Sequence, residues 1–359
     1  MMIGLARRGY SNTGGAEAFL RRFAGALTAA GHASRLYTTS DWPRESWSAG
    51  EVIPLSGRTP REFADALTTR NPRAECDFLF SLERVWTCDG YRAGDGVHVA
   101  WLQRRAAIEP PWRSKLHRFN PKHRQLLALE FALFAGGGAK KIIVNSQMIA
   151  FEIREHYGVA PDRIRLVYNG LPAVSFERSP RAERAGRNEL RVLFAGSGWM
   201  RKGLAQAISA VDLLPASLNP VLVVAGRGDP EKFHASNRVR YLGPVADMAA
   251  QYDAADLFLL PTVYDPFSNA CLEALAAGLP VITTRANGFA EILPPDAAGA
   301  AVNNPSDVAA LAAALEHWAE PARLRSARHA AREIASTFTI EKTVAQTLEA
   351  LAGPAPAPR

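Results

Sequence analysis

Four apolar runs in the second half of the chain constrain its fold more than any other feature. They are residues 192–196, 221–226, 256–261 and 280–284, and each ends in a glycine, a proline or a threonine. Their apolar residues are consecutive rather than alternating, which is typical of strands that are covered on both faces. Such strands occur in parallel sheets flanked by helices. The sequence therefore predicts an α/β domain in this half.

The chain opens with a unit of the same type. A short apolar run at residues 2–6 leads into a small-residue loop at 9–15, and a helical pattern follows at 19–27 with Gly31 as a suitable stop. Strand, glycine turn and helix in this order open a doubly wound α/β fold. Further strands are predicted at residues 35–38, 78–81 and 141–145, and helices at 61–69, 121–135, 146–157, 306–318, 321–335 and 340–352.

A polar segment divides the chain into two domains. Residues 179–188 are charged and low in bulk, which is typical of an interdomain linker. We predict the α/β class, with two Rossmann-like doubly wound domains that face each other across a cleft. The predicted boundaries are 1–172 for the N-terminal domain, 173–189 for the linker, 190–338 for the C-terminal domain, 339–352 for a helix that crosses back to the N-terminal domain, and 353–359 for a disordered tail. Ligands of such sheets bind beyond the carboxyl ends of the strands, where the glycine turns lie.

The composition excludes several other classes of protein. Of the 359 residues, 48% are apolar and 21% are charged, as in ordinary globular domains, so extensive disorder is not expected. No apolar stretch approaches the ~20 residues of a membrane span. The charges of Arg7 and Arg8 follow the first apolar run, which is the wrong order for a signal peptide. Cys76, Cys88 and Cys271 stand singly, which suits a reducing cytoplasm and provides neither a disulfide framework nor a metal site.

The net charge of +7 is unevenly distributed along the chain. Residues 1–189 carry 28 Lys and Arg against 19 Asp and Glu, a balance of +9, whereas residues 190–359 carry 14 against 16, a balance of −2. This excess favours an anionic partner of the first half, and it is concentrated at residues 101–124. That segment contains the cations Arg104, Arg105, Arg113, Lys115, Arg118, Lys122 and Arg124, the aromatic residues Trp101, Trp112 and Phe119, and the one acid Glu109. It is a plain solvated surface, a membrane-interface patch or a nucleic-acid patch.

The most specific motif pairs two acids across a helix start. Asp265 lies in a loop after a predicted strand, and Glu273 lies one turn inside the helix that begins near Ser268 or Asn269, both good N-caps. The first amides of this helix point toward the loop and can bind a phosphate, while the two carboxylates can bind sugar hydroxyls. An acid near a helix start also stabilises the helix dipole, and for Asp265 alone that explanation is competitive.

Residues 265–282 resemble the acid-x7-Glu motif of the retaining family-four glycosyltransferases of the GT-B fold. The match includes the spacing of Asp265 and Glu273 and the sequence Glu-Ala-Leu-Ala-Ala-Gly-Leu-Pro-Val-Ile that begins at Glu273. Within that family the chain is most similar to lipopolysaccharide core glycosyltransferases, over nearly its full length and including residues 92–98. The first acid of the family motif is usually Glu, whereas here it is Asp265, a shorter carboxylate that still binds hydroxyls.

The resemblance implies a donor site in the C-terminal domain. Asp265 would bind hydroxyls of the donor sugar, Glu273 would bind the ribose of the nucleotide, and amides around Ala270 would bind the diphosphate. The donor-binding residues predicted in this way are Gly14, Gly15, Gly196, Arg201, Lys202, Arg227, Val245, Asp265, Ser268, Asn269, Ala270, Cys271 and Glu273.

A glycine turn with two cations follows the first strand of the C-terminal domain. Gly196 and Gly198 precede Arg201 and Lys202. An isolated pair of surface cations is usually only solvated, but this pair follows a strand and a turn. Cations in that place suit a diphosphate whose charge grows as it leaves. By the resemblance, Arg201 and Lys202 would bind the diphosphate of the donor.

Weaker signals lie in other glycine-rich loops. Asp95, between two glycines, matches the family position near the acceptor hydroxyl and the transferred sugar, and for the nearby His98 a structural role is equally expected. Residues 14–15 match a loop that approaches the diphosphate from the other domain, and Arg227 and Val245 lie in loops that match those around the base. Ordinary turn chemistry explains these loops as well. The predicted catalytic residues are Asp95, His98, Arg201, Lys202 and Asp265.

These features predict a retaining glycosyltransferase that moves a hexose from a nucleotide-sugar, with a UDP-sugar favoured, to a membrane-associated glycolipid such as the lipopolysaccharide core. We expect it in the cytoplasm at the inner face of the membrane, held by residues 101–124 to anionic lipid. The nucleotide-sugar is a co-substrate, and neither a further cofactor nor a metal is expected. Two alternatives remain. A nucleotide-sugar 2-epimerase shares the fold, and a nucleic-acid-binding protein would explain the charge but not Asp265, Glu273 and Lys202.

Overall fold

The computed structural model describes residues 1–359 except 12–13, 176–188 and 353–359. The chain divides into two units, the first made of Met1–Gly170 with the segment that starts at Ile340, and the second of Leu171–Thr339. The C-terminal helix therefore belongs with the N-terminal unit. Most of the predicted linker and all of the predicted tail lie outside the described residues.

The first unit contains a seven-stranded parallel sheet in the order β3-β2-β1-β4-β5-β6-β7. Its strands are β1 Met2–Ala6, β2 Ala33–Thr39, β3 Gly50–Leu55, β4 Phe78–Ser81, β5 Cys88–Arg92, β6 Ala139–Val144 and β7 Ile164–Leu166. The chain moves outward from β1 to β3 and then resumes at β4 on the other side of β1. The connections that follow β1 and β4 therefore diverge at the carboxyl edge between these two strands, which is the position where such sheets bind ligands.

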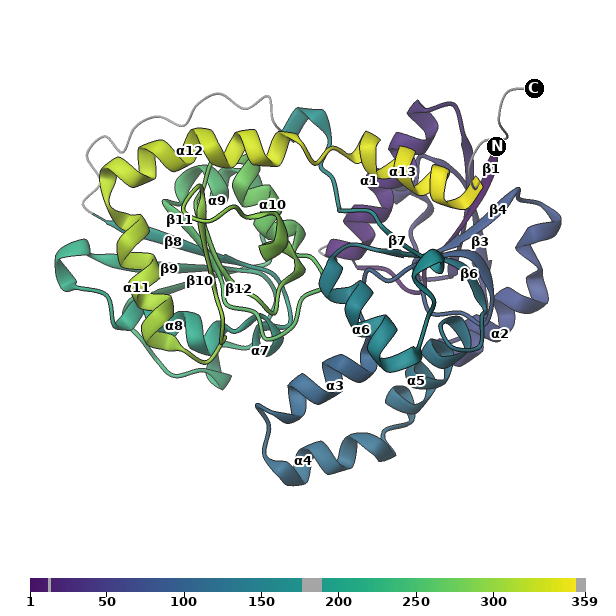
Figure 1. Ribbon diagram of the computed structural model, residues 1–359, viewed down its shortest axis with the longest axis horizontal. Coiled ribbons are helices and arrows are strands. Elements are labelled where there is room, and N and C mark those ends of the chain that lie inside the picture. The colour runs from purple at the N-terminus through teal and green to yellow at the C-terminus, as the bar shows by residue number, and fades with distance from the viewer. Residues whose placement is uncertain (12–13, 176–188, 353–359) are drawn as a thin grey trace. The chain divides into compact units, whose positions relative to one another are not determined.

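Helices cover both faces of this sheet (Figure 1). They are α1 Gly15–Ala29, α2 Pro60–Arg70, α3 His98–Ala106, α4 Pro111–Leu116, α5 Pro121–Leu133, α6 Gln147–Tyr157 and α13 Ile340–Ala352. Helices α1 and α13 pack together on one face, and α2 and α5 pack together on the other. The helices α3 and α4 project away from the sheet.

The second unit repeats this plan with six parallel strands in the order β10-β9-β8-β11-β12-β13. The strands are β8 Leu190–Ala195, β9 Pro220–Ala225, β10 Val239–Gly243, β11 Leu257–Leu260, β12 Val281–Thr284 and β13 Gly299–Val302. The helices are α7 Trp199–Lys202, α8 Leu204–Asp212, α9 Met248–Ala254, α10 Asn269–Ala276, α11 Val308–Ala319 and α12 Pro321–Ser336. Here the connections diverge between β8 and β11.

Local sequence explains where these helices begin and end. Helix α2 starts with a capping box, in which Thr59 and Glu62 satisfy each other's backbone amides. Helix α6 starts at the N-cap Ser146 and ends at Gly158, which adopts the left-handed conformation.

The C-terminal helix completes the core of the first unit. Ile340, Val344 and Ala350 of α13 are buried in one apolar cluster with Phe19 and Phe23 of α1. The Thr343 hydroxyl donates a hydrogen bond of 2.9 Å to the backbone oxygen of Tyr168, which fixes the helix to the chain beyond β7. The apolar face of α1 is thus covered by residues from the other end of the sequence.

The predicted fold class is confirmed, and each of the four apolar runs contains a strand of the second sheet. The sequence analysis did not predict β3, β5, β7, β10 and β13. Strand β5 is polar in sequence but buried, because the Asp89 carboxylate accepts a hydrogen bond from the Leu79 amide and pairs with Arg73 and Lys140. Strand β10 ends at Gly243, and its register with β9 shifts between Tyr241 and Gly243.

None of the helices in the described parts of the chain is long and apolar enough to span a bilayer.

Loss of the α13 contacts should unfold the first unit selectively. Ile340 is 2% exposed, and truncating such a side chain to alanine costs about 2 kcal/mol or more. We expect Ile340→Ala to accelerate hydrogen exchange of the amides in β1 and β4, with those of β9 as the internal reference. Gln346→Ala, at an exposed position of the same helix, is the control and should change neither set. Equal acceleration in both sheets would contradict the assignment of α13 to the first unit.

Candidate active site

The turn after β8 brings a lysine to the carboxyl edge of the second sheet. Gly196 has a φ of +133°, and a Cβ built on it would lie 3.0 Å from Cε of Lys202, so the lysine stem packs directly on this glycine. Gly203 has a φ of +78°, and a Cβ there would lie 2.0 Å from the backbone oxygen of Pro261. Only glycine permits this close approach of the turn to the chain beyond β11.

Lys202 and Asp265 form an ion pair at this edge. The Lys202 ammonium donates to the Asp265 carboxylate at 2.9 Å, and a guanidinium nitrogen of Arg201 lies 3.9 Å from the same oxygen. Arg201 also donates to the backbone oxygen of Tyr264 at 2.9 Å. Burial alone would raise the pKa of the Asp265 carboxyl, but the adjacent charges of Lys202 and Arg201 hold that pKa below its ordinary value.

The loop that carries Asp265 is fixed by Asn287, which the sequence analysis missed. The Asp265 amide donates to the Ala286 oxygen at 3.0 Å, and the Asp265 oxygen accepts from the Gly288 amide at 2.9 Å. The buried side chain of Asn287 accepts from the Ser268 amide at 3.2 Å and donates to Thr283. An asparagine after a buried strand is the one sequence signal for this role, and it is shared with ordinary turns.

Helix α10 begins beside this loop. The Ser268 hydroxyl caps it by accepting a hydrogen bond of 3.4 Å from the Cys271 amide, so that amide, predicted to bind diphosphate, already has an internal partner. The Cys271 thiol is fully buried, and burial raises its pKa to about 12. One turn further on, the half-buried Glu273 accepts a hydrogen bond of 3.1 Å from the hydroxyl of Tyr252 on α9.

An aromatic group lies on the other side of the β8 turn. Trp199 donates from its indole nitrogen to the Gly196 oxygen at 3.0 Å, and its ring contacts those of Phe233 and Tyr241. A Cβ on Gly228 would lie 2.3 Å from this indole, so the ring fills the space where a side chain would stand. The turn that carries the cations is therefore rigidly backed by the loop after β9.

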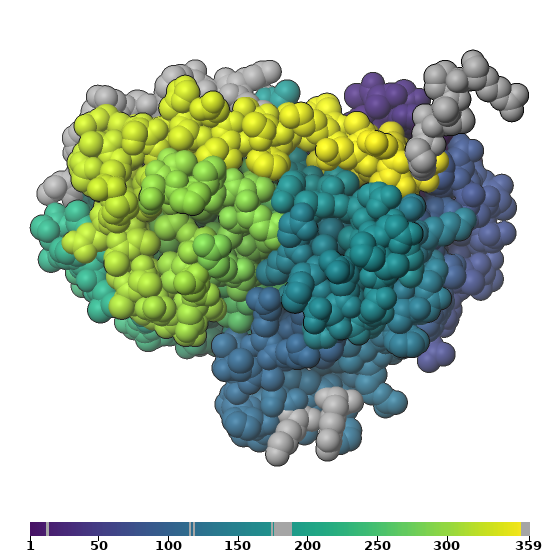
Figure 2. All heavy atoms as spheres, viewed as in Figure 1, coloured from purple at the N-terminus to yellow at the C-terminus, as the bar shows by residue number. Residues whose placement is uncertain are grey.

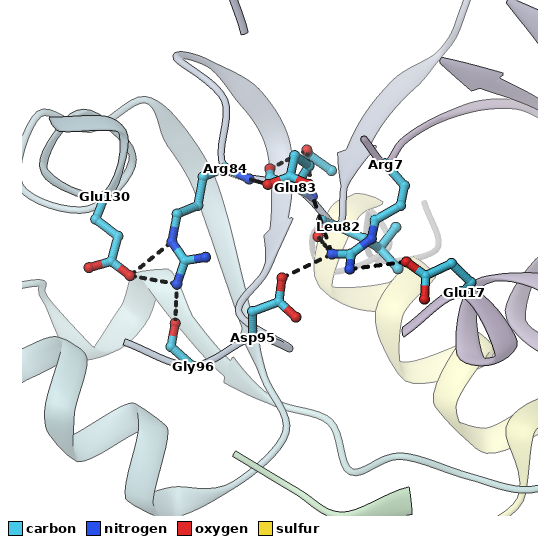
Figure 3. Close-up of polar contacts among 9 residues, drawn as sticks. Arg7, Glu17, Leu82, Glu83, Arg84, Asp95, Gly96 and Glu130 are labelled. Carbon is cyan, nitrogen blue, oxygen red and sulfur yellow. Dashed lines mark hydrogen bonds and ion pairs between the residues drawn. The ribbon is translucent and has the colours of Figure 1, made fainter. Parts of the chain in front are cut away.

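The first unit has its own charged network at the edge between β1 and β4 (Figure 3). Arg7, directly after β1, donates to the Asp95 carboxylate at 2.9 Å and to the Leu82 oxygen at 3.1 Å. Its other nitrogen pairs with Glu17 at 3.3 Å, and Glu83 lies 4.0 Å away. Burial alone would lower the pKa of Arg7, but the surrounding carboxylates raise it above its ordinary value. A single arginine thus orders three acids.

Glu17 explains the glycine that precedes α1. A Cβ on Gly14 would lie 1.7 Å from a carboxylate oxygen of Glu17, so the acid occupies the side-chain space of this glycine. Gly15, by contrast, has open space around its Cα. Gly14 thus accommodates the partner of Arg7, a role that sequence reasoning did not assign to it.

A second buried pair holds His98. Arg84 donates to Glu130 at 2.7 Å and to the Gly96 oxygen at 2.9 Å, and the same Glu130 oxygen accepts from the His98 amide at 2.6 Å. His98 begins α3 rather than lying in the turn with Asp95, and its Nε2 is 3.0 Å from Nδ1 of His123. Burial, followed by the charge of Arg84, lowers the pKa of His98 to about 3, so the ring is neutral at pH 7.

Both units match known sequence families. Residues 13–173 match the family described as "Glycosyltransferase Family 4", and residues 189–320 match "Glycosyl transferases group 1". The lipopolysaccharide glucosyltransferase WaaG of Escherichia coli (strain K12) is 26% identical over 329 residues, which cover 85% of this chain and 86% of that protein. The chain belongs to these glycosyltransferases.

Solved structures support the GT-B fold. A crystal structure of WaaG, described as a glycosyltransferase involved in lipopolysaccharide biosynthesis, superposes with a TM-score of 0.81 at 24% identity and covers 98% of this chain and 100% of that one. Anabaena Alr3699/HepE in complex with UDP-glucose superposes with a TM-score of 0.73 at 18% identity and covers 98% of this chain and 99% of that one.

Within this glycosyltransferase, the predicted residues fall into two groups. Those of the second unit gather at the edge between β8 and β11: Gly196, Arg201, Lys202, Asp265, Ser268, Asn269, Ala270, Cys271 and Glu273. Arg227 is exposed after β9 and Val245 is half-buried after β10, both farther along the sheet. Gly14, Gly15, Asp95 and His98 belong to the first unit. Sequence reasoning missed Arg7, Arg84, Glu130, Tyr252 and Asn287, which hold the predicted residues in place.

Removal of the lysine should leave Asp265 buried without its closest counter-charge. We expect Lys202→Met to lower the free energy of unfolding by about 3 kcal/mol at neutral pH, as for a broken buried pair. The ionised Asp265 stabilises the wild-type fold above the carboxyl's unfolded pKa of about 4, and this stabilisation is lost as the pH falls through the lowered folded pKa. The difference between the two proteins should therefore shrink in acid. Urea titrations at several pH values measure it.

The exposed Lys232, which pairs with the exposed Asp229, is the matched control, and Lys232→Met should change the free energy of unfolding little. Adding Asp265→Asn to Lys202→Met should recover part of the loss. A pH-independent difference between wild type and Lys202→Met would count against the ion pair as its cause.

Proposed function

We propose that this glycosyltransferase moves a hexose from a nucleotide-sugar, with UDP-glucose as the first candidate, to a glycolipid acceptor, with retention of the anomeric configuration. The observation that carries the proposal is the ion pair of Lys202 with Asp265 beside the start of α10. This edge joins a cationic turn, an acid and a helix N-terminus, which together match the parts of a sugar diphosphate.

The donor binds by exchanging one ion pair for another. The diphosphate takes the charge of Lys202 and Arg201, and Asp265 is then released to accept hydrogen bonds from sugar hydroxyls. Glu273, held by Tyr252, accepts from the ribose. The UDP-glucose complex of the similar Anabaena protein supports UDP-glucose as a candidate donor.

The reaction is proposed as a front-face displacement. The acceptor hydroxyl attacks from the side of the leaving group, its proton passes to the departing phosphate oxygen, and Asp95 orients the hydroxyl. Lys202 and Arg201 stabilise the charge that grows on the phosphate as the bond to the sugar breaks. In the described residues no group of three or more His, Cys, Asp or Glu side chains is arranged to hold a metal ion. The proposal assigns the stabilisation of the diphosphate to the two cations.

A transfer assay tests the proposal. Purified protein is incubated with labelled UDP-glucose, GDP-mannose or ADP-glucose and with lipopolysaccharide truncated in its core, and label in the lipid fraction is measured. We expect transfer from the UDP-sugar and an α-linked product by NMR. Lys202→Ala should lower turnover roughly 100-fold or more, as expected for lost preorganised charge. Absence of transfer from every donor would refute the proposal, and a C2 epimer formed without acceptor would identify a 2-epimerase instead.

Donor affinity provides the control for this assay. Glu273→Ala should weaken UDP and UDP-glucose alike by about 1–3 kcal/mol in calorimetry, as for a lost hydrogen bond to a charged group. Glu316→Ala, at an exposed position of α11, should leave both affinities unchanged. An unchanged UDP affinity in Glu273→Ala would show that Glu273 does not bind the ribose.

The projecting part of the first unit supports a membrane-associated acceptor. Trp112 and Leu116 on α4 and Phe119 just beyond it are 60%, 55% and 64% exposed, in a segment that stands out from the rest of this unit (Figure 2). Two of the seven cations in residues 101–124 are paired, Arg104 with Glu152 and Arg105 with Glu109. Arg113, Lys122 and Arg124 are exposed, and the side chains of Lys115 and Arg118 lie outside the described residues. Exposed rings among cations suit an anionic bilayer.

Vesicle binding tests this part of the proposal. The protein should sediment with vesicles of equal parts phosphatidylglycerol and phosphatidylcholine, much less with phosphatidylcholine alone, and be released by high salt. The triple variant Arg113→Gln, Lys122→Gln, Arg124→Gln should bind on the order of a hundredfold more weakly, at ~1 kcal/mol for each cation. Trp112→Ser with Phe119→Ser should also weaken binding at low salt, because it removes the apolar anchor while leaving the cations in place.

The matched control replaces exposed cations of the second unit, with Lys232→Gln, Arg323→Gln and Arg325→Gln, and should bind vesicles as the wild type does. Equal sedimentation with neutral and anionic vesicles, or none at low salt, would show that the segment is an ordinary solvated surface.

A further inference from the structure

One buried cation of the first unit lacks a counter-charge. Arg92, the last residue of β5, is 3% exposed, and its Nη1 has no hydrogen-bond partner. Among the residues that the structure describes, no carboxylate forms an ion pair with it, and burial lowers the pKa of its guanidinium to about 9. Buried charges in proteins are normally paired, so an unpaired one indicates a missing partner.

The neutral groups around Arg92 satisfy only part of it. Its Nη2 donates to the side-chain oxygen of Asn169, and its guanidinium lies 4.1 Å from the ring centroid of Phe19 on α1. Arg84, also buried, differs because Glu130 neutralises it. Arg84, a buried arginine with a structural role, is thus paired with an acid, whereas Arg92 is not paired with any acid of the described residues.

A second unpartnered group lies at the same edge of the sheet. The side-chain oxygen of Asn145 is buried without a hydrogen-bond partner. Asn145 follows β6, two residues beyond Ile143, which is the register partner of Arg92, and Asn169 follows the neighbouring β7. The adjacent parallel strands β5 and β6 thus lead to a donor, Nη1 of Arg92, and an acceptor, Oδ1 of Asn145, that both lack a hydrogen-bond partner within the described parts of the chain. A water molecule would satisfy the hydrogen bonds, but it would leave the charge of Arg92 unbalanced.

The place of Arg92 indicates which substrate brings the missing charge. Arg92 ends β5, and the loop that carries Asp95 follows directly. A Cβ on Gly94 of this loop would lie 3.7 Å from Nε of Arg92, so the loop packs on the arginine side chain. An anion on Arg92 would therefore lie against the loop that carries Asp95, the residue proposed to orient the acceptor hydroxyl. The loop and the ring of Phe19 cover the guanidinium, so binding requires one of them to move.

We propose that Arg92, with Asn145 and Asn169, binds an acidic substituent of the acceptor sugar, a carboxylate or a phosphate. The inference rests on the proposed function, since it takes Asp95 as the acceptor-side group. It adds a requirement on the acceptor: the sugar that receives the hexose, or its neighbour, is acidic.

Binding of small acids to the full-length protein tests the site without turnover. Glucuronate, glucose 6-phosphate and inorganic phosphate are titrated at constant ionic strength, with glucose as the neutral control, and melting temperature and calorimetric affinity are measured. At least one of the acids should stabilise the wild type saturably, and glucose should not. Arg92→Met should weaken that acid at least about tenfold, as for a lost charge-assisted hydrogen bond.

Two variants separate a binding arginine from a structural one. Without ligand, Arg92→Met should melt at or above the wild-type temperature, because it removes an unbalanced buried charge. Arg84→Met should melt at a lower temperature, because it leaves Glu130 buried without its counter-charge. Asn169→Asp would place a carboxylate on Arg92. It should raise the melting temperature and abolish binding of the acid.

Three results would overturn the proposal. They are no saturable stabilisation of the wild type by any of the acids, equal stabilisation of wild type and Arg92→Met, and a melting temperature of Arg92→Met as low as that of Arg84→Met. UDP distinguishes the source of the anion, because weaker UDP binding in Arg92→Met with sugar acids unaffected would assign the site to the donor. Transfer activity is measured separately, so its absence in the wild type would refute the proposed function while the binding result still decides this site.

Discussion

Each unit depends on an ion pair at the edge where its strand connections diverge. In the second unit Lys202 follows β8 and reaches Asp265 beyond β11, and in the first unit Arg7 follows β1 and reaches Asp95 beyond β5. A parallel sheet leaves a crevice at such an edge, since no crossover covers it. Lys202 offsets the charge of the buried Asp265, and Arg7 offsets part of the charge of its three acids. These contacts hold the loops around each crevice, and the same groups can exchange partners when a ligand binds.

The fold could be predicted from the sequence where burial is uniform. Strands β8, β9, β11 and β12 are covered on both faces, so their apolar residues are consecutive and leave a clear signal. Strand β5 has no such signal, because its Asp89 is neutralised by residues far away in the chain. Strand β7 has three residues, too few for any periodicity. What pattern reasoning missed is therefore the part of each sheet whose stability depends on tertiary partners.

The site shows the same division. Asp265, Glu273 and the Arg201-Lys202 pair could be predicted as candidates because motif and local turn lie together in the sequence. The residues that hold them, such as Asn287, Arg7 and Glu130, stand alone in the sequence and meet their partners only through the order of the strands. The charge count over residues 101–124 left out one ion-pair partner for a related reason. Arg104 is neutralised by Glu152 on another helix, which no count over residues 101–124 includes.

The position of α13 has a consequence for synthesis. The apolar face of α1 emerges early from the ribosome, but Ile340 and Val344, which cover it, emerge after the whole second unit. At roughly 5–20 residues per second, that delay is on the order of ten seconds or more. Throughout this time the first unit lacks α13, and the apolar face of α1 lacks the side chains that cover it. Until Ile340 and Val344 emerge, the apolar side chains of α1 are open to contact with chaperones or with other nascent chains.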